Sequence, residues 1–321
     1  MPDKPIKSRI AELVAVVPPK AKQPNSANVL SNWITLAEGR VGLDAQGGRL
    51  GWLVASSVAI AAVQRALDAD GRQLFLLKGG TLLQHRLNVT ARTTKDVDGL
   101  VRGDMDTFLE ELEGALSQPW GVVALRRGPV EIVNVPTKII KPRRFNIIME
   151  VRGVVWRRVQ FEISPDEAGI GDMGEYIEPT PLSGFGLPDP DTLVGIAMQY
   201  QIAQKIHAVS DPHDPPVSGN DRARDVPDLL LLRDLCRSNG SPTLVELRRA
   251  CVAVFEARAA EARQLGFPGR EWPPVVVAHG HWADDYRRAA ASAGIGLPLG
   301  QAVVEVNEWI AEIDAADRLA E

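Results

Sequence analysis

The sequence predicts an α+β protein, with strands and helices mixed up to about residue 165 and helices alone after about residue 190. Short, nearly continuous apolar runs, which are typical of buried strands, are concentrated in the first part. Apolar residues recur at helical spacing in the second part. Between the two, residues 165–190 contain five prolines and five glycines, a composition that is typical of loops. We therefore expect an N-terminal extension, a mixed domain, a linker and a helical domain, at residues 1–50, 51–165, 166–190 and 191–321.

The periodicity of the apolar residues places the elements along the chain. In the first half, helices are expected where apolar residues recur every three or four positions, at 27–36, 50–67, 81–87 and 105–116. Strands are expected where apolar residues run together or alternate with polar ones, at 74–77, 97–101, 121–125, 145–151 and 154–163. In the second half, helices are expected at 191–209, 227–236, 244–265 and 302–319, with Asp191 as the cap of the first.

The composition is that of a globular protein in a reducing compartment. Of the 321 residues, 45% are apolar and 24% are charged. No apolar run approaches the roughly 18 residues that cross a bilayer, and the first residues lack the regions of a secretory signal. The two cysteines, Cys236 and Cys251, are expected to be core thiols of helices. We therefore expect a cytoplasmic protein with no membrane partner.

A strand that ends in a double glycine is the first candidate binding site. The apolar run ends at Lys78 and is followed by Gly79, Gly80 and Thr81 at the start of a predicted helix. Glycine lets the backbone approach a ligand closely because it has no Cβ atom, and the amides at a helix start favour an anion such as phosphate. The spacing excludes a P-loop and a dinucleotide fingerprint. Taken alone, a double glycine after a strand is more often a simple turn.

Two carboxylates follow on the next predicted strand. Asp96 and Asp98 are one residue apart, so both side chains leave the same face of a strand. Mg²⁺, held by carboxylates and substrate phosphates, is the usual occupant of such a site. Glu162 would be a third ligand if its strand lies beside the first. For each of these side chains the alternative is a solvated surface carboxylate, but the order of glycines and carboxylates indicates a nucleoside-triphosphate site with one or two Mg²⁺ ions, used for nucleotidyl transfer.

Charge is distributed unevenly along the chain. The net charge of −5 gives no general attraction to nucleic acid. Between residues 121 and 160, however, nine lysines and arginines stand against two glutamates. This basic segment indicates a phosphate-bearing partner such as RNA, and its alternative is a solvated strand face with salt bridges. Aromatic residues make up only 5% of the chain, which argues against an extensive base-stacking platform.

Two charged groups in the helical half complete the candidate residues. Lys205 lies in a largely apolar helix, where a lysine either extends to water or meets an anion. Arg222, Asp225 and Asp228 cluster at the start of the next predicted helix, whose first turn accommodates Pro227. Asp225 has a structural alternative as the N-cap of that helix.

These motifs together resemble the AbiEii/AbiGii toxin family of nucleotidyltransferases. The motifs are Lys-Gly-Gly-Thr-Leu, Arg-x-Thr-x-Asp-x-Asp, Gln-Lys-Ile-x-Ala and Arg-x-Arg-Asp-x-x-Asp-Leu, and they stand in the family's order between Leu74 and Leu229. The first two are shared with the wider nucleotidyltransferase superfamily and the last two single out this family. Gly99 departs from the pattern, because an apolar residue is more usual after the second aspartate.

The resemblance implies a nucleotidyltransferase-fold mixed β-sheet flanked by helices, followed by a C-terminal helical domain. It implies that Gly79, Gly80 and Thr81 hold the triphosphate, that Asp96 and Asp98 bind the metal, that Lys205 contacts nucleotide phosphate, and that Asp225 is essential to catalysis. Lys78 is a further candidate for phosphate charge, and Arg92, Arg222 and Asp228 are candidates for support of the site.

Members of the family are toxins of toxin–antitoxin or abortive-infection systems, and some add nucleotides to the 3′ end of tRNA. The resemblance thus implies an RNA acceptor, with tRNA favoured, a block of translation and growth, and a cognate antitoxin as partner. Two alternatives stay open: nucleotidylation of a protein side chain by the same site, and an inactive nucleotide-binding partner module. A histidine-based metal regulator is disfavoured, because His279 and His281 form the only close pair among five histidines.

Overall fold

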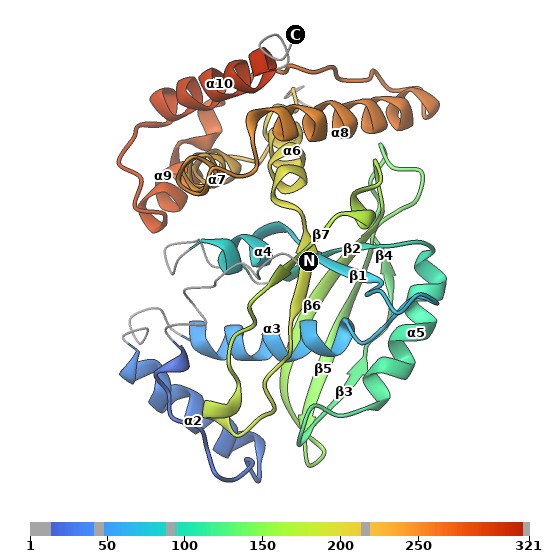
Figure 1. Ribbon diagram of the computed structural model, residues 1–321, viewed down its shortest axis with the longest axis vertical. Coiled ribbons are helices and arrows are strands. Elements are labelled where there is room, and N and C mark those ends of the chain that lie inside the picture. Colours follow the sequence, from blue (N-terminus) through green and yellow to red (C-terminus); the bar gives the residue numbers. More distant parts are fainter. Residues whose placement is uncertain (1–13, 42–47, 88–93, 95, 213–218, 317–321) are drawn as a thin grey trace. The chain divides into compact units, whose positions relative to one another are not determined.

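The computed structural model describes residues 14–41, 48–87, 94, 96–212 and 219–316. The chain divides into two compact units, one that ends at Ile196 and one that begins at Ala197 and also takes in Pro136–Ile139. We call them the sheet unit and the helical unit, and Figure 1 labels most of their elements.

The sheet unit is built on a mixed β-sheet. Within the described residues, eight strands form it in the order β3–β5–β6–β2–β1–β8–β7, and β4 pairs with β5. The pairs β2–β6 and β1–β8 are parallel, whereas the remaining pairs are antiparallel. The strands are β1 (Phe75–Lys78), β2 (Asp96–Val101), β3 (Val123–Arg127), β4 (Glu131–Ile132), β5 (Arg143–Val151), β6 (Val154–Pro165), β7 (Gly174–Ile177) and β8 (Leu193–Ile196). The predicted α+β class with a mixed sheet is confirmed.

Helices flank this sheet, and one of its faces carries an aromatic core. The helices are α2 (Ala27–Arg40), α3 (Arg49–Val63), α4 (Gly79–Arg86) and α5 (Met105–Ser117), with 3₁₀ turns at Ile170–Asp172 and Ser183–Phe185. Helix α3 runs along the sheet and packs against α5 and β6 (Figure 1). The rings of Phe75, Phe145 and Phe161 from three strands pack together and reach Phe108 of α5, with centroids 5.6–6.3 Å apart.

The aromatic core explains the glycine that follows the second aspartate. A Cβ atom added to Gly99 would lie 1.9 Å from the ring of Phe75. Any larger residue at this position would displace that ring from its contacts with Phe108 and Phe161. Glycine therefore stands at position 99, where the family usually has an apolar residue, because the ring of Phe75 occupies the space that a side chain would need.

Strand β8 lies where the start of a helix was expected, so the prediction of a helix from Asp191 is wrong over its first residues. Leu193–Ile196 is fully buried and pairs in parallel with β1 through Leu77 and Gly195. The side chain of Gln64 completes this junction: it donates to the carbonyls of Phe75 (3.1 Å) and Val194 (2.6 Å) and accepts from the Val194 amide (3.0 Å). Helix α6 begins only at Met198.

The sheet unit is also longer at both ends than the expected mixed domain. Strand β7 lies within the expected linker and pairs with β8, which places residues 166–190 inside this unit. The described part of residues 1–50 belongs to the same unit, where Val17 packs so closely on Gly184 that an added Cβ atom would meet it at 2.9 Å.

The helical unit packs five α-helices within the described residues. They are α6 (Met198–Val209), α7 (Asp225–Asn239), α8 (Leu244–Gln264), α9 (Ala283–Ser292) and α10 (Leu299–Ala315), with a 3₁₀ turn at Gly280–Trp282. Helix α6 packs against α7 and α8, and α10 packs against both of those helices. Cys236 and Cys251 are buried thiols, as expected. Among the described helices, none is long and apolar enough to cross a membrane.

Candidate active site

The start of helix α4 lies directly against a carboxylate of β2. Lys78 ends β1 opposite Asp98 in the antiparallel register, and Gly79 opens α4. Gly79 has a φ of +66°, and a Cβ atom added to it would lie 2.1 Å from Oδ2 of Asp98. Only glycine satisfies both the backbone angle and the space. The sequence therefore places an aspartate carboxylate and the first turn of a helix side by side.

Two threonine hydroxyls hold the beginning of β2 in place. Thr81, which is buried on α4, donates to the backbone carbonyl of Asp96 at 2.8 Å. Thr94 donates to the Asp96 carboxylate at 2.8 Å and to its carbonyl at 3.2 Å. The Thr81 hydroxyl thus already has a partner, which leaves the backbone of Gly79, Gly80 and Thr81 as the part that would face a phosphate.

A row of four charged side chains crosses the sheet in register. Lys78 of β1 stands opposite Asp98 of β2, Asp98 beside Glu162 of β6, and Glu162 opposite Arg144 of β5. Residues paired across neighbouring strands point to the same face. The row therefore places two carboxylates in the middle and one cation at each end. We call these four residues the charged row.

Both cations of the charged row form hydrogen bonds within this face. Lys78 Nζ donates to Ser164 Oγ at 2.6 Å, and Arg144 Nη2 donates to Glu162 Oε2 at 2.8 Å. The hydrogen bond and charge of Glu162 raise the pKa of Arg144, and the charges of Glu131 and Asp96 add to this effect against the cost of desolvation. Sequence reasoning missed Ser164, although it shares the alternation of Glu162 along the same strand.

The residues present fit a Mg²⁺ ion held by two carboxylates. Asp96 and Asp98 are partly exposed on one face of β2, and Mg²⁺ in nucleotide sites commonly takes one or two carboxylates together with substrate phosphates. Across the described part of the chain, no three His, Cys, Asp or Glu side chains gather closely enough to hold a metal ion by themselves. Glu162, expected as a third ligand, lies beside Asp98 in the register and accepts a hydrogen bond from Arg144.

Lys205 and the two aspartates of the fourth motif form a buried triad in the helical unit. Lys205 Nζ on α6 donates to Asp225 Oδ1 at 2.6 Å and to Asp228 Oδ2 at 2.7 Å, both in the first turn of α7. The three side chains are only 4–9% exposed. The N-cap of α7 is Arg224 and not Asp225, so the carboxylate of Asp225 contacts the lysine rather than capping its own helix. We call these residues the lysine triad.

Two supporting candidates, Arg92 and Arg222, remain. Arg92 lies outside the described residues. Arg222 is exposed and forms no ion pair among the described residues, and its backbone amide donates to Asn220 Oδ1 at 2.9 Å.

The basic segment is largely neutralised by its own neighbours. Within residues 121–160 the structure pairs four arginines with nearby carboxylates: Arg126 with Glu150, Arg127 with Glu113, Arg143 with Asp106 and Arg144 with Glu162. Lys138 pairs with Glu261. Of the two interpretations of this segment, a strand face with salt bridges describes these five residues better than a continuous polyanion surface.

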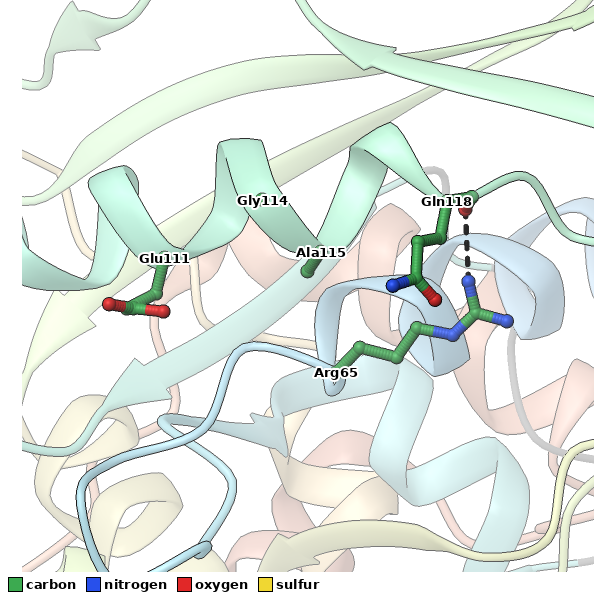
Figure 2. A pocket seen from close by; sticks show the side chains of 5 residues that line it. All are labelled: Arg65, Glu111, Gly114, Ala115 and Gln118. Carbon is green, nitrogen blue, oxygen red and sulfur yellow. Dashed lines mark hydrogen bonds between the residues drawn. The ribbon is translucent and has the colours of Figure 1, made fainter.

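A shallow depression on the sheet unit lies apart from the charged row. It is lined by Arg65, Glu111, Gly114, Ala115 and Gln118, mainly along α5 (Figure 2). Arg65 Nη1 donates to the carbonyl of Gln118 at 2.9 Å, and its guanidinium lies 4.3 Å from the ring centroid of Trp120. These contacts fix Arg65 as a packing residue, and we assign no ligand to this depression.

A known protein family matches most of this chain. The sequence profile of the nucleotidyl transferase AbiEii toxin, of type IV toxin–antitoxin systems, matches residues 62–316. No curated protein matches significantly. Among solved structures, the chain is similar to the nucleotidyltransferase toxin MenT4 from Mycobacterium tuberculosis, with 15% identity, a TM-score of 0.45, and coverage of 90% of this chain and 99% of that chain. Because the profile spans most of its length, the chain belongs to the AbiEii family of nucleotidyltransferase toxins.

Proposed function

We propose that this toxin transfers a nucleotide from a nucleoside triphosphate to an RNA acceptor, with tRNA favoured, and that Mg²⁺ takes part. The observation that carries the proposal is the contact of Gly79 with Asp98. A glycine with a positive φ opens α4 directly against a carboxylate. A helix start that would bind phosphate and a carboxylate that would hold a metal ion therefore lie side by side, as nucleotidyl transfer requires.

The proposal gives a role to each candidate site residue of the sheet unit named below. Asp96 and Asp98 would hold the ion, which when bound would lower the pKa of the attacking hydroxyl and neutralise the leaving pyrophosphate. Gly79, Gly80 and Thr81 would present backbone amides to the triphosphate. Lys78 would add positive charge beside them. Most of the chemistry is then positioning and charge stabilisation, and little covalent work falls to the protein.

The family resemblance also implies roles for the lysine triad. Lys205 would contact nucleotide phosphate, Asp225 would act in catalysis, and Asp228 would support them. Lys205 Nζ donates short hydrogen bonds to both aspartates, and these bonds fix the direction of its ammonium group. The supporting role of Arg222 and Arg92 remains a prediction.

The biological part of the proposal follows from the family. Transfer to tRNA would block translation and growth, and a cognate antitoxin would restrain it. We place this activity in the cytoplasm, where nucleoside triphosphates and tRNA are available. Growth arrest on expression that Asp98→Asn abolishes would support this part.

The proposal is tested by giving the purified chain each of four α-labelled triphosphates with Mg²⁺, and either tRNA or total protein. We expect label in tRNA with one or more triphosphates, and none after chelation of the metal. Asp98→Asn is the matched control, because it removes a charge with little change of size. Label in protein alone would replace RNA with a protein target. No label in either pool would leave a nucleotide-binding module without activity.

A further inference from the structure

Arg144 is the member of the charged row for which neither the motifs nor the strand pattern predicts a role. It lies on β5, outside all four motifs, and its side chain is 40% exposed. Among the described residues, Nη2 is the only nitrogen of its guanidinium with a hydrogen-bond partner, the Glu162 carboxylate. A guanidinium carries five N–H donors. Because Nε is buried, the donors that remain for a ligand are those of Nη1 and the second N–H of Nη2.

A bulge in the β5–β6 hairpin creates this placement. The strands are joined by the two-residue turn Arg152–Gly153, and their register shifts by one residue between Met149 and Glu150. Without the shift, Arg144 would stand opposite Phe161, which points into the aromatic core. Because a one-residue change of register moves side chains to the other face, the bulge is what brings Arg144 to the face of Asp96 and Asp98.

We propose that Arg144 binds a phosphate group in the active site and that Glu162 is its positioning residue rather than a metal ligand. This inference rests on the proposed nucleotidyl transfer. The planar guanidinium of Arg144 can donate two hydrogen bonds to a pair of phosphate oxygens. The Glu162 carboxylate holds Nη2, which orients the rest of the guanidinium.

The order of the strands indicates which phosphate is bound. Helix α4 and Lys78 lie on the β1 side of Asp98, and Arg144 lies on the opposite side, beyond β6. Neighbouring strands are about 4.8 Å apart, so Arg144 and Lys78 approach the carboxylates from opposite flanks. If the triphosphate occupies the α4 flank, the phosphate at Arg144 belongs to the RNA acceptor. The triphosphate itself is the other source, and the experiment separates the two.

The first test compares Arg144→Gln with Arg143→Gln. Arg143 is the adjacent residue, pairs with Asp106 and lies on the other face of β5, so it controls for the loss of one positive charge. We expect Arg144→Gln to raise KM for the RNA acceptor by roughly tenfold or more, because the variant loses a hydrogen bond to a charged group. The slope of log affinity against log salt should fall by about 0.7, as for one phosphate contact with a single strand. Arg144→Lys should give an intermediate KM.

The outcomes separate the two sources and the two hypotheses. A weaker Kd for the triphosphate with unchanged acceptor KM would assign the same phosphate contact to the nucleotide. Unchanged acceptor KM, triphosphate Kd and salt slope in Arg144→Gln would overturn the proposal. If the wild type transfers nothing to RNA, the proposed function fails first, and triphosphate binding alone still tests Arg144.

The second test asks whether Glu162 binds the metal. Mn²⁺ is titrated into wild type, Glu162→Gln and Asp98→Asn in the presence of a non-hydrolysable triphosphate, and its binding is followed by electron paramagnetic resonance. We expect Glu162→Gln to keep Mn²⁺ affinity within about twofold and to show the raised acceptor KM of Arg144→Gln, because its positioning contact is lost. A loss of Mn²⁺ affinity as large as that in Asp98→Asn would make Glu162 a metal ligand and overturn its assigned role. Thermal melting of each variant identifies any that fails to fold.

Discussion

The charged row and the lysine triad place the same kinds of side chain in opposite settings. In the charged row, Asp98 and Glu162 are partly exposed on a sheet face, with a cation on each flank. In the lysine triad, one ammonium and two carboxylates are nearly excluded from solvent and bond to one another.

This difference separates side chains that can bind a ligand from side chains that stabilise the fold. An exposed charge is already solvated and exchanges water for a ligand at little cost, whereas a buried charge depends on its partners. We therefore expect changes in the charged row to alter binding and rate, and changes in the lysine triad to alter the stability of the helical unit as well. The predictions below test this contrast in order of expected size.

The largest effect is expected for Asp98→Asn. Loss of a metal-binding carboxylate removes several kcal/mol of transition-state stabilisation, so nucleotide transfer should fall by roughly 10³-fold or more. Because Asp98 is partly exposed, the melting temperature of the variant should stay within a few degrees of that of the wild type. Single-turnover transfer and a melting curve on the same preparation measure both. A variant that keeps full transfer would remove Asp98 from the active site.

Lys205→Met should act on stability. It leaves Asp225 and Asp228 buried beside each other without their cation, which should cost about 3–5 kcal/mol and lower the melting temperature of the helical unit by roughly 10 °C. Arg237→Met is the matched control, because Arg237 pairs with Glu312 at the surface of the same unit, and should cost no more than about 1 kcal/mol. An unchanged melting temperature with lost transfer would make the lysine triad purely catalytic.

The sequence predicted contacts between residues that are close along the chain better than contacts between residues that the fold brings together. The apolar run, the double glycine and the two aspartates are local, so β1, α4 and β2 were correctly placed and Asp98 was found beside the helix start. The pairing of Lys205 with Asp225 and Asp228 joins two helices, and only the family resemblance brought these residues together.

Two tertiary features could not be predicted for physical reasons. Strand β8 has four residues, three of them apolar, which are too few for a period, and its burial beside β1 depends on Gln64, more than a hundred residues away. The bulge at Met149 and Glu150 has no glycine or proline to signal it, yet it decides that Arg144 meets Glu162. Glu162 was therefore expected at the metal, although its register partner is an arginine.

His85 should give the sheet unit a pH-dependent stability. Burial lowers its pKa to about 4, below the ordinary value of about 6.5. As pH falls from about 6.5 to 4, the unfolded chain takes up a proton that the folded chain does not, so stability is full above this window and falls within it. The loss should approach about 3 kcal/mol at pH 4. Urea midpoints between pH 4 and 7 measure it, and His85→Leu should flatten that part of the profile.

Observing no such flattening would mean that His85 is protonated in the folded state. Because His85 lies on α4, the result also bears on the comparison of the two regions. The buried side of this helix carries His85, while its half-buried first residue, Gly79, lies against Asp98 of the charged row.

The smallest effect is expected for Thr81→Val, which tests how the charged row is kept in place. The hydroxyl of Thr81 donates to the Asp96 carbonyl from a buried position, and its loss leaves that carbonyl without this donor, at a cost of about 1–2 kcal/mol. Thr107→Val, which removes an exposed hydroxyl on α5, is the control and should cost less. If the hydroxyl only ties α4 to β2, transfer should fall by less than tenfold and triphosphate affinity should change little. A loss of triphosphate affinity as large as that in a variant of Lys78 would instead give Thr81 a direct phosphate contact, and would mean that its hydroxyl leaves Asp96 when the nucleotide binds.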